Sequence, residues 1–130
     1  MRVRMFKPQF APLVKSGVKR QTIRPIPKRM PKVGDKESWR QWSGLPYRSP
    51  QIELARVEIV GVERIKFEET GREFLVSLPD RPPRGALMPI DEWTDFAKAD
   101  GFKGMRDMAI WFEQNHGLPF EGIVIRTKDA

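Results

Sequence analysis

The sequence predicts a single α+β domain in which strands outnumber helices. Three observations lead to this fold class. The chain has 130 residues, a length that fits one domain. Stretches in which apolar and polar residues alternate, as they do in strands, occur at five or six places. Three other segments place apolar residues at the spacing of an amphipathic helix, without regular βαβ alternation.

The N-terminal part is predicted to contain a strand, a short helix and a second strand. Residues 2–6 alternate basic and apolar side chains, as a half-exposed strand does. A short helix begins at Pro8 and ends at Gly17, which suits a left-handed helix cap. A strand over 21–24 follows and stops before a proline.

The middle of the chain is predicted to be mostly strand. The dipeptide Gly34-Asp35 is a turn signal before a strand over 37–42. Residues 52–65 alternate over an unusual length, and the pattern shifts near Gly61. This shift predicts a bulge or bend in one long strand.

The C-terminal part is predicted to contain both longer helices. A weaker strand over 74–78 comes first, followed by helices over 90–99 and 105–115 and a closing strand over 120–126. A proline-rich loop, 79–89, separates the weaker strand from the first helix. A small, closed or nearly closed barrel with helices over its ends would hide this many strand edges.

The composition excludes several kinds of site. Cysteine is absent, so the chain has no disulfide and no thiolate nucleophile. His116 is the only histidine, which excludes a two-histidine metal site, and we expect no metal and no cofactor. No apolar run approaches the ~20 residues that cross a bilayer, and the N-terminus lacks a secretory signal. We therefore expect a cytoplasmic protein without a membrane partner.

Positive charge is concentrated in the first part of the chain. The formal net charge is +7. Residues 1–48 hold 13 Lys and Arg against Asp35 and Glu37, whereas acids outnumber bases in residues 49–130. Clustered positive charge is typical of proteins that bind phosphate polymers or other anions. The alternative is a basic surface that serves only solubility.

The segment 17–24 holds the most informative group of polar residues. If the strand is extended, Thr22 and Arg24 point to the same face of the sheet. Lys19 lies in the preceding turn, from which its ammonium group can reach over that face. These three groups can bind a phosphate or a carbonyl oxygen, and a lysine of lowered pKa can assist a threonine hydroxyl. A basic surface turn is the alternative.

In the segment 36–48, aromatic residues lie among basic residues. Interleaved aromatic and arginine side chains are typical of surfaces that stack single-stranded bases. At least one tryptophan of this segment is expected in the core, and one of Trp42 and Tyr47 is expected to line a cleft.

His116, which precedes a glycine, is expected to cap a helix. The predicted nucleic-acid surface comprises Lys28, Arg29, Lys32 and Arg40.

Three stretches of the chain resemble the ASCH family. The first, 10–24, reads FAPLVKSGVKRQTIR and is similar to the family's short helix followed by Gly-x-Lys, Thr and Arg. The second, 32–35, resembles the family's KxGD turn. The third, 97–126, resembles its C-terminal pattern of a helix that ends in His-Gly or Tyr-Gly and a closing strand. Only residues 66–90 have no counterpart, and we expect a loop-rich insertion there.

The resemblance implies a fold and a type of site. It implies a PUA-like β-barrel with a cleft for RNA or nucleosides. One branch of the family removes the acetyl group from N4-acetylcytidine, and its active residues fall on Lys19, Thr22 and Asp100, with the family arginine on Arg24. That branch has a glutamate at the position of Asp100, which is one methylene longer. A second branch resembles a metal-stimulated ribonuclease for single-stranded RNA.

Two classes of function follow from the sequence. The first is an amidohydrolase of N4-acylated cytidine, in which Lys19 accepts the proton of Thr22 and Asp100 assists the leaving amine. The second is a non-catalytic RNA-binding module, with a single-stranded-RNA ribonuclease as a further alternative. In either class the protein is expected to be a monomer or a small homo-oligomer. The expected substrate-binding residues are Gly17, Arg20, Arg24, Trp42 and Tyr47.

Overall fold

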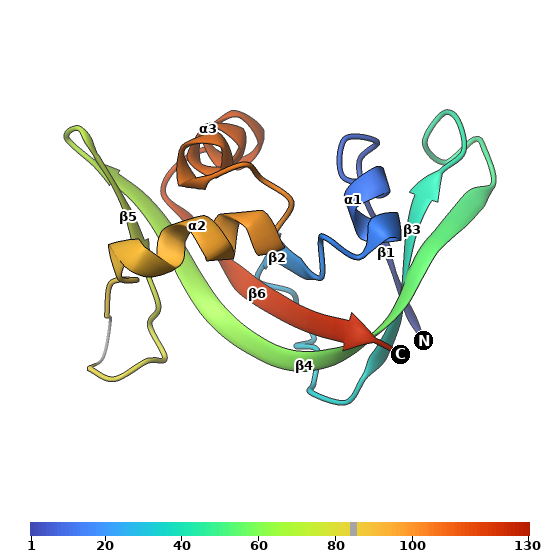
Figure 1. Cartoon of the computed structure of the whole chain (residues 1–130), viewed down its shortest axis with the longest axis horizontal. Helices are drawn as coiled ribbons and strands as arrows, with labels where there is room; N and C mark the ends of the chain where they lie inside the picture. Colours follow the sequence, from blue (N-terminus) through green and yellow to red (C-terminus); the bar gives the residue numbers. More distant parts are fainter. Residues whose placement is uncertain (84–85) are drawn as a thin grey trace.

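One long strand organises the sheet. The computed structural model describes residues 1–83 and 86–130, and in it β4 (Gln51–Thr70) runs for 20 residues. It arches across the molecule and pairs with three other strands (Figure 1). Its pairing with β6 shifts register between Ile59 and Gly61, which confirms the irregularity predicted near Gly61. A bulge increases local twist, so this position helps the strand to curve.

The other strands are arranged on both sides of β4. Its beginning pairs with β3 (Lys36–Trp42), its middle and end pair with β6 (Phe120–Asp129), and its end also pairs with β5 (Glu73–Ser77), all antiparallel. The strand β1 (Arg2–Met5) lies parallel to β3, and β2 (Gln21–Pro25) lies antiparallel to β6. The predicted α+β class is therefore confirmed, with six strands in one mostly antiparallel sheet.

The described strands do not close into a ring. The order is β1-β3-β4-β6-β2, so β1 and β2 are the two ends of the path and do not pair with each other. Side chains join them instead: Nη2 of Arg24, on β2, donates to the carbonyl oxygen of Met5, on β1, at 3.0 Å. The sheet is thus open at a seam between β1 and β2, and a barrel remains a prediction.

Three helices pack on the concave side of the arch (Figure 1). They are α1 (Ala11–Ser16), α2 (Ile90–Ala99) and α3 (Met105–His116), close to the predicted ranges. Gly17 ends α1 in the left-handed conformation, at φ 89°, as its sequence predicts. None of the described helices is long and apolar enough to cross a membrane.

Aromatic side chains fill the space between the helices and the sheet. Phe112 of α3 lies 4.8 Å from Phe67 of β4 and 5.1 Å from Phe120 of β6, measured between ring centroids. Trp39 of β3 is fully buried, as expected for at least one tryptophan. This core orients α3 and the end of α2 toward the seam.

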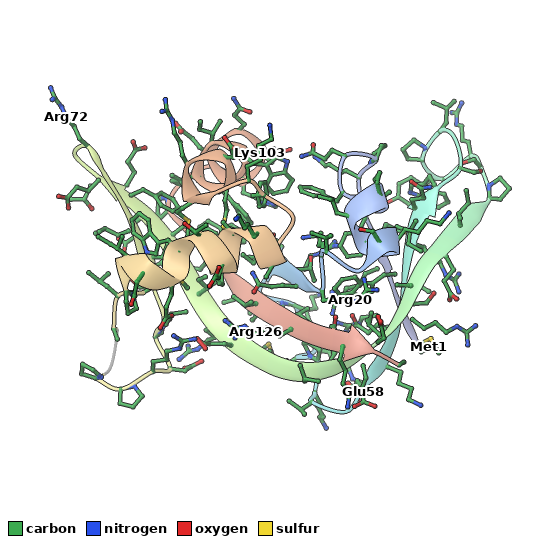
Figure 2. All side chains as sticks on the ribbon, in the orientation of Figure 1. Met1, Arg20, Glu58, Arg72, Lys103 and Arg126 are labelled. Atoms are coloured by element: carbon green, nitrogen blue, oxygen red, sulfur yellow. The ribbon has the colours of Figure 1, made fainter. Side chains whose placement is uncertain are left out.

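The segment 66–90 is more regular than the predicted loop-rich insertion. The end of β4 and all of β5 form an antiparallel hairpin, from whose tip Arg72 extends into solvent (Figure 2). Alternation of apolar residues continues through Phe67, Phe74 and Val76, which pack on the core. Only the proline-rich part beyond β5 is loop among the described residues, with one bridge between Ser77 and Leu87.

Gly122, on β6 beside β2, provides a test of how closely the sheet packs around it. A Cβ at Gly122 would lie 2.4 Å from the carbonyl oxygen of Arg24 and 2.7 Å from the ring of Phe120. We expect Gly122→Ala to lower the free energy of unfolding by about 1–3 kcal/mol, because the neighbours must move. Urea denaturation measures this change.

The matched control is Gly61→Ala, in the same sheet. A Cβ at Gly61 would make an ordinary contact of 3.8 Å with Cβ of Arg126, so this substitution is expected to leave stability nearly unchanged. Equal stability of the two variants would contradict the close packing at Gly122.

Candidate functional site

A cavity of about 240 Å³ lies at the seam between β1 and β2. The end of β1 and the residues after it form one wall, and β2 forms the opposite wall with Thr22 and Arg24. The helical side supplies Asp100, from the end of α2, and the aromatic rings of α3. The cavity exists because the sheet is open here, since a continuous ladder between β1 and β2 would occupy the same space.

The turn between α1 and β2 places Lys19 at the inner end of this cavity. The cap at Gly17 reverses the chain, and the backbone N–H of Lys19 then donates to the carbonyl oxygen of Leu13 at 3.0 Å. Lys19 is only 2% exposed. Its Nζ atom donates to the carbonyl oxygen of Asp100 at 2.5 Å and lies 3.2 Å from Oδ2 of the same residue.

The end of α2 places Asp100 opposite Lys19. Asp100 is 3% exposed and is followed by Gly101 at φ 93°, where a Cβ would crowd Lys19 at 3.1 Å. The amide of Gln21 donates to Oδ1 of Asp100 at 3.2 Å. The sequence motif and the C-terminal pattern, 81 positions apart, thus meet in one buried ion pair.

Burial shifts both members of the pair toward their neutral forms. Desolvation lowers the pKa of Lys19, and the charge of Asp100 opposes this shift in part. Desolvation raises the pKa of Asp100, against the opposing effects of Lys19 and Gln21. Both directions favour the neutral amine on Lys19, and a neutral amine can act as a base.

Thr22 and Arg24 lie on the same face of β2, as the alternation predicts. Nε of Arg24 donates to Oγ1 of Thr22 at 3.1 Å. Thr22 is 3% exposed. Burial, followed by the charge of Arg4, lowers the pKa of Arg24 to about 10, so its guanidinium stays cationic at neutral pH. Among the residues described, Arg24 has no carboxylate within ion-pair distance.

Several residues at the cavity were not predicted as site residues. Gln21 was treated only as part of a strand, yet its side chain binds Asp100. His116 is the last residue of α3, whose cap is Gly117 and not His116 as predicted, and it lines the cavity together with Asn115 and Lys7. Nothing in the local sequence distinguishes these residues, because their positions depend on how α3 packs on the sheet.

Three of the predicted substrate-binding residues lie away from this cavity. Arg20 comes just before β2 and lines a different cavity, and its Nε donates to Oδ1 of Asp129 at 2.7 Å. Trp42 and Tyr47 contact each other, with ring centroids 5.1 Å apart, but neither lines the cavity, and Tyr47 is 89% exposed. They lie at the end of β3 and in the loop after it.

Gly17 acts through the backbone and does not line the cavity. Its N–H donates to the carbonyl oxygen of Val14 at 3.2 Å, as part of the helix cap. This N–H is therefore already used within the helix cap.

The four predicted nucleic-acid residues lie outside this cavity. Lys28, Arg29 and Lys32 are exposed in the loop between β2 and β3. Arg29 lines a second cavity, of about 470 Å³, that includes Arg2 and Lys36. Arg40 lies on β3 and donates to Ser38 and Gln51. None of these four residues lines the cavity that holds Lys19.

Comparison with known proteins does not decide the function. The chain matches no family model, no curated protein and no solved structure. Within residues 1–83 and 86–130, no three acidic or histidine side chains gather closely enough to hold a metal ion. The function is therefore argued from the residues of the cavity.

The buried pair makes stability depend on pH in a specific way. In Lys19→Met, Asp100 loses its cationic partner, and burial keeps its pKa above the ordinary value of 3.8. The unfolded chain then releases this proton at lower pH than the folded chain does. We therefore expect the free energy of unfolding of Lys19→Met to fall as pH rises from about 4 toward 7, relative to wild type.

The double variant Lys19→Met with Asp100→Asn is the control. It has neither buried charge, so the additional pH dependence should disappear, and it should be more stable than either single variant. Urea denaturation between pH 4 and pH 8 measures both effects. A pH dependence in Lys19→Met identical to that of wild type would contradict the coupling.

Proposed function

We propose that this protein is an ASCH-like amidohydrolase that removes the acyl group from N4-acylated cytidine or a related nucleoside. The observation that carries the proposal is the Lys19–Asp100 pair, buried at a cavity that also holds Thr22 and Arg24. Buried titratable groups with opposed pKa shifts in a cleft are typical of catalytic sites. In this proposal the fold is PUA-like, and the seam between β1 and β2 is the substrate cleft.

The size and walls of the cavity support a single nucleoside as the ligand. Its volume of about 240 Å³ is slightly below the ~300–1,000 Å³ of typical small-molecule pockets. Rings from Phe6, Phe10 and Trp111 line it, and planar bases stack on such surfaces. One base therefore fits inside, whereas the rest of a polymer would have to remain outside.

The first chemical step is attack by Thr22. The neutral amine of Lys19 accepts the hydroxyl proton of Thr22, and Oγ1 forms a bond to the acyl carbon. Arg24 already donates a hydrogen bond to Oγ1 and so orients the hydroxyl group for attack. Lys19 becomes an ammonium group, which Asp100 stabilises at 3.2 Å.

The second part of the reaction releases the amine and regenerates the enzyme. The carbon–nitrogen bond breaks, and the proton held by the Lys19–Asp100 pair passes to the exocyclic amine of cytidine. The acyl group is then an ester of Thr22. Water, which gives a proton to the same pair, attacks this ester and releases the carboxylic acid, and the proton returns to Oγ1 of Thr22.

We expect purified protein to release cytidine from N4-acetylcytidine. Thr22→Val keeps the shape of the buried side chain but removes the nucleophile, so activity should fall about a hundredfold or more. Asp100→Asn should also lose activity, because the ammonium group that forms on Lys19 during the reaction then has no anionic partner. The wild-type rate should rise with pH as Lys19 loses its proton, below the ordinary lysine pKa of 10.5. Chromatography of the products measures these rates.

The control is Lys15→Ala, which removes an exposed lysine of α1 outside the cavity. It should keep the full rate. Release of cytidine by Thr22→Val at the wild-type rate would exclude Thr22 as the nucleophile. Absence of product with folded wild-type protein would exclude this substrate.

A non-catalytic RNA-binding module is the second candidate. The exposed basic loop between β2 and β3, next to the cavity that contains Arg2 and Lys36, favours it. Such a surface holds the phosphate backbone, and binding weakens as salt rises because counterions are released.

For this candidate, we expect Lys28→Ala with Arg29→Ala to weaken binding of single-stranded RNA. Each phosphate contact that is lost should lower the slope of log affinity against log salt by ~0.7. Fluorescence anisotropy at several salt concentrations measures the slope. The control removes two exposed lysines elsewhere, with Lys98→Ala and Lys103→Ala, and equal losses in both variants would indicate only a general effect of charge.

A further inference from the structure

The charges around the cavity are not balanced. Lys7, Lys19 and Arg24 are the basic side chains of lysine and arginine that line it, whereas Asp100 is the only carboxylate that lines it among the described residues. The carboxylate of Asp100 is occupied by Lys19 and Gln21. Lys7 and Arg24 therefore face the cavity without an anionic partner.

The two free cations are held in place by neutral groups. Nζ of Lys7 donates to Oδ1 of Asn115 at 2.7 Å and lies 5.4 Å from the ring centroid of Trp111. Two nitrogens of Arg24 donate to Thr22 and Met5, and within the described residues the third, Nη1, has neither a hydrogen-bond partner nor full burial. Both cations thus keep donor capacity for a ligand.

The surroundings of His116 indicate that the charges of Lys7 and Arg24 act on the same part of the cavity. It lines the same cavity, and its ring centroid lies 5.6 Å from that of Trp111, over which Lys7 is placed. After burial, the charges of Lys7 and Arg24 are the causes that lower the pKa of His116. An anion bound near these residues would reduce the electrostatic repulsion among Lys7, Arg24 and His116.

We propose that the ligand of this cavity is a nucleotide, whose phosphate ester binds Lys7 and Arg24 at the opening while the base lies inside. The inference rests on the proposed function, since it places the base in the same cavity. It changes the substrate class from an uncharged nucleoside to an N-acylated nucleoside phosphate. A phosphate ester carries close to two negative charges, which match the two unpaired cations.

Calorimetric titration at low salt tests the proposal with cytidine, its 5′- and 3′-monophosphates and inorganic phosphate. We expect at least one monophosphate to bind about tenfold more tightly than cytidine, because charge-assisted hydrogen bonds to phosphate are added. Lys7→Ala should reduce this preference to about twofold, and Lys7→Arg should retain it. The control Lys15→Ala removes the same charge from the exposed face of α1 and should retain the preference.

The outcomes separate this inference from the proposed function. Equal affinity for cytidine and both monophosphates, together with hydrolysis of N4-acetylcytidine, would exclude a nucleotide as the preferred ligand. The proposed amidohydrolase activity would remain. An undiminished preference in Lys7→Ala would overturn the assigned phosphate position. Inorganic phosphate that binds as tightly as the nucleotides, or a single-stranded RNA that binds when they do not, would also overturn the inference. Failure of every cytidine ligand to bind would overturn both proposals.

Discussion

The buried contact between Lys19 and Asp100 is the interaction on which the site depends. It joins the turn after α1 to the end of α2, two segments that are distant in the sequence. Removing two charges from water is unfavourable, and removal of one partner of such a pair costs about 3–5 kcal/mol. The protein reduces this cost with a further hydrogen bond from Gln21 to the carboxylate of Asp100.

The open seam is the second constraint. A backbone ladder between β1 and β2 would satisfy more hydrogen bonds, but it would remove the cavity. The structure replaces the ladder with the side chain of Arg24, which donates to Met5 across the gap, and with the ring of Phe6, 4.8 Å from the guanidinium. Edge strands usually need such cover to avoid pairing with other chains. Here the cover also places the charged guanidinium of Arg24 at the cavity.

Elements with a strong local pattern could be predicted closely. The helix over 90–99 has the predicted bounds, because its apolar residues recur at helical spacing and a proline precedes it. The length of the long strand was underestimated, since β4 extends to Thr70 and β5 pairs with its end. The proximity of Lys19 and Asp100 has no local pattern and entered only through a family resemblance. Gln21, Lys7 and His116 were missed as site residues for the same reason.

The sequence alone determined the α+β class, the basic N-terminal part and the residue types able to act at the site. These properties depend on composition and on periodicities of two and 3.6 residues, which are local. Only the tertiary structure decided that the sheet stays open, that Trp42 and Tyr47 lie away from the cavity, and that α3 brings His116 to it. These outcomes depend on how a bent sheet and the aromatic core pack together. That packing joins residues far apart in the chain, and no short stretch of sequence contains it.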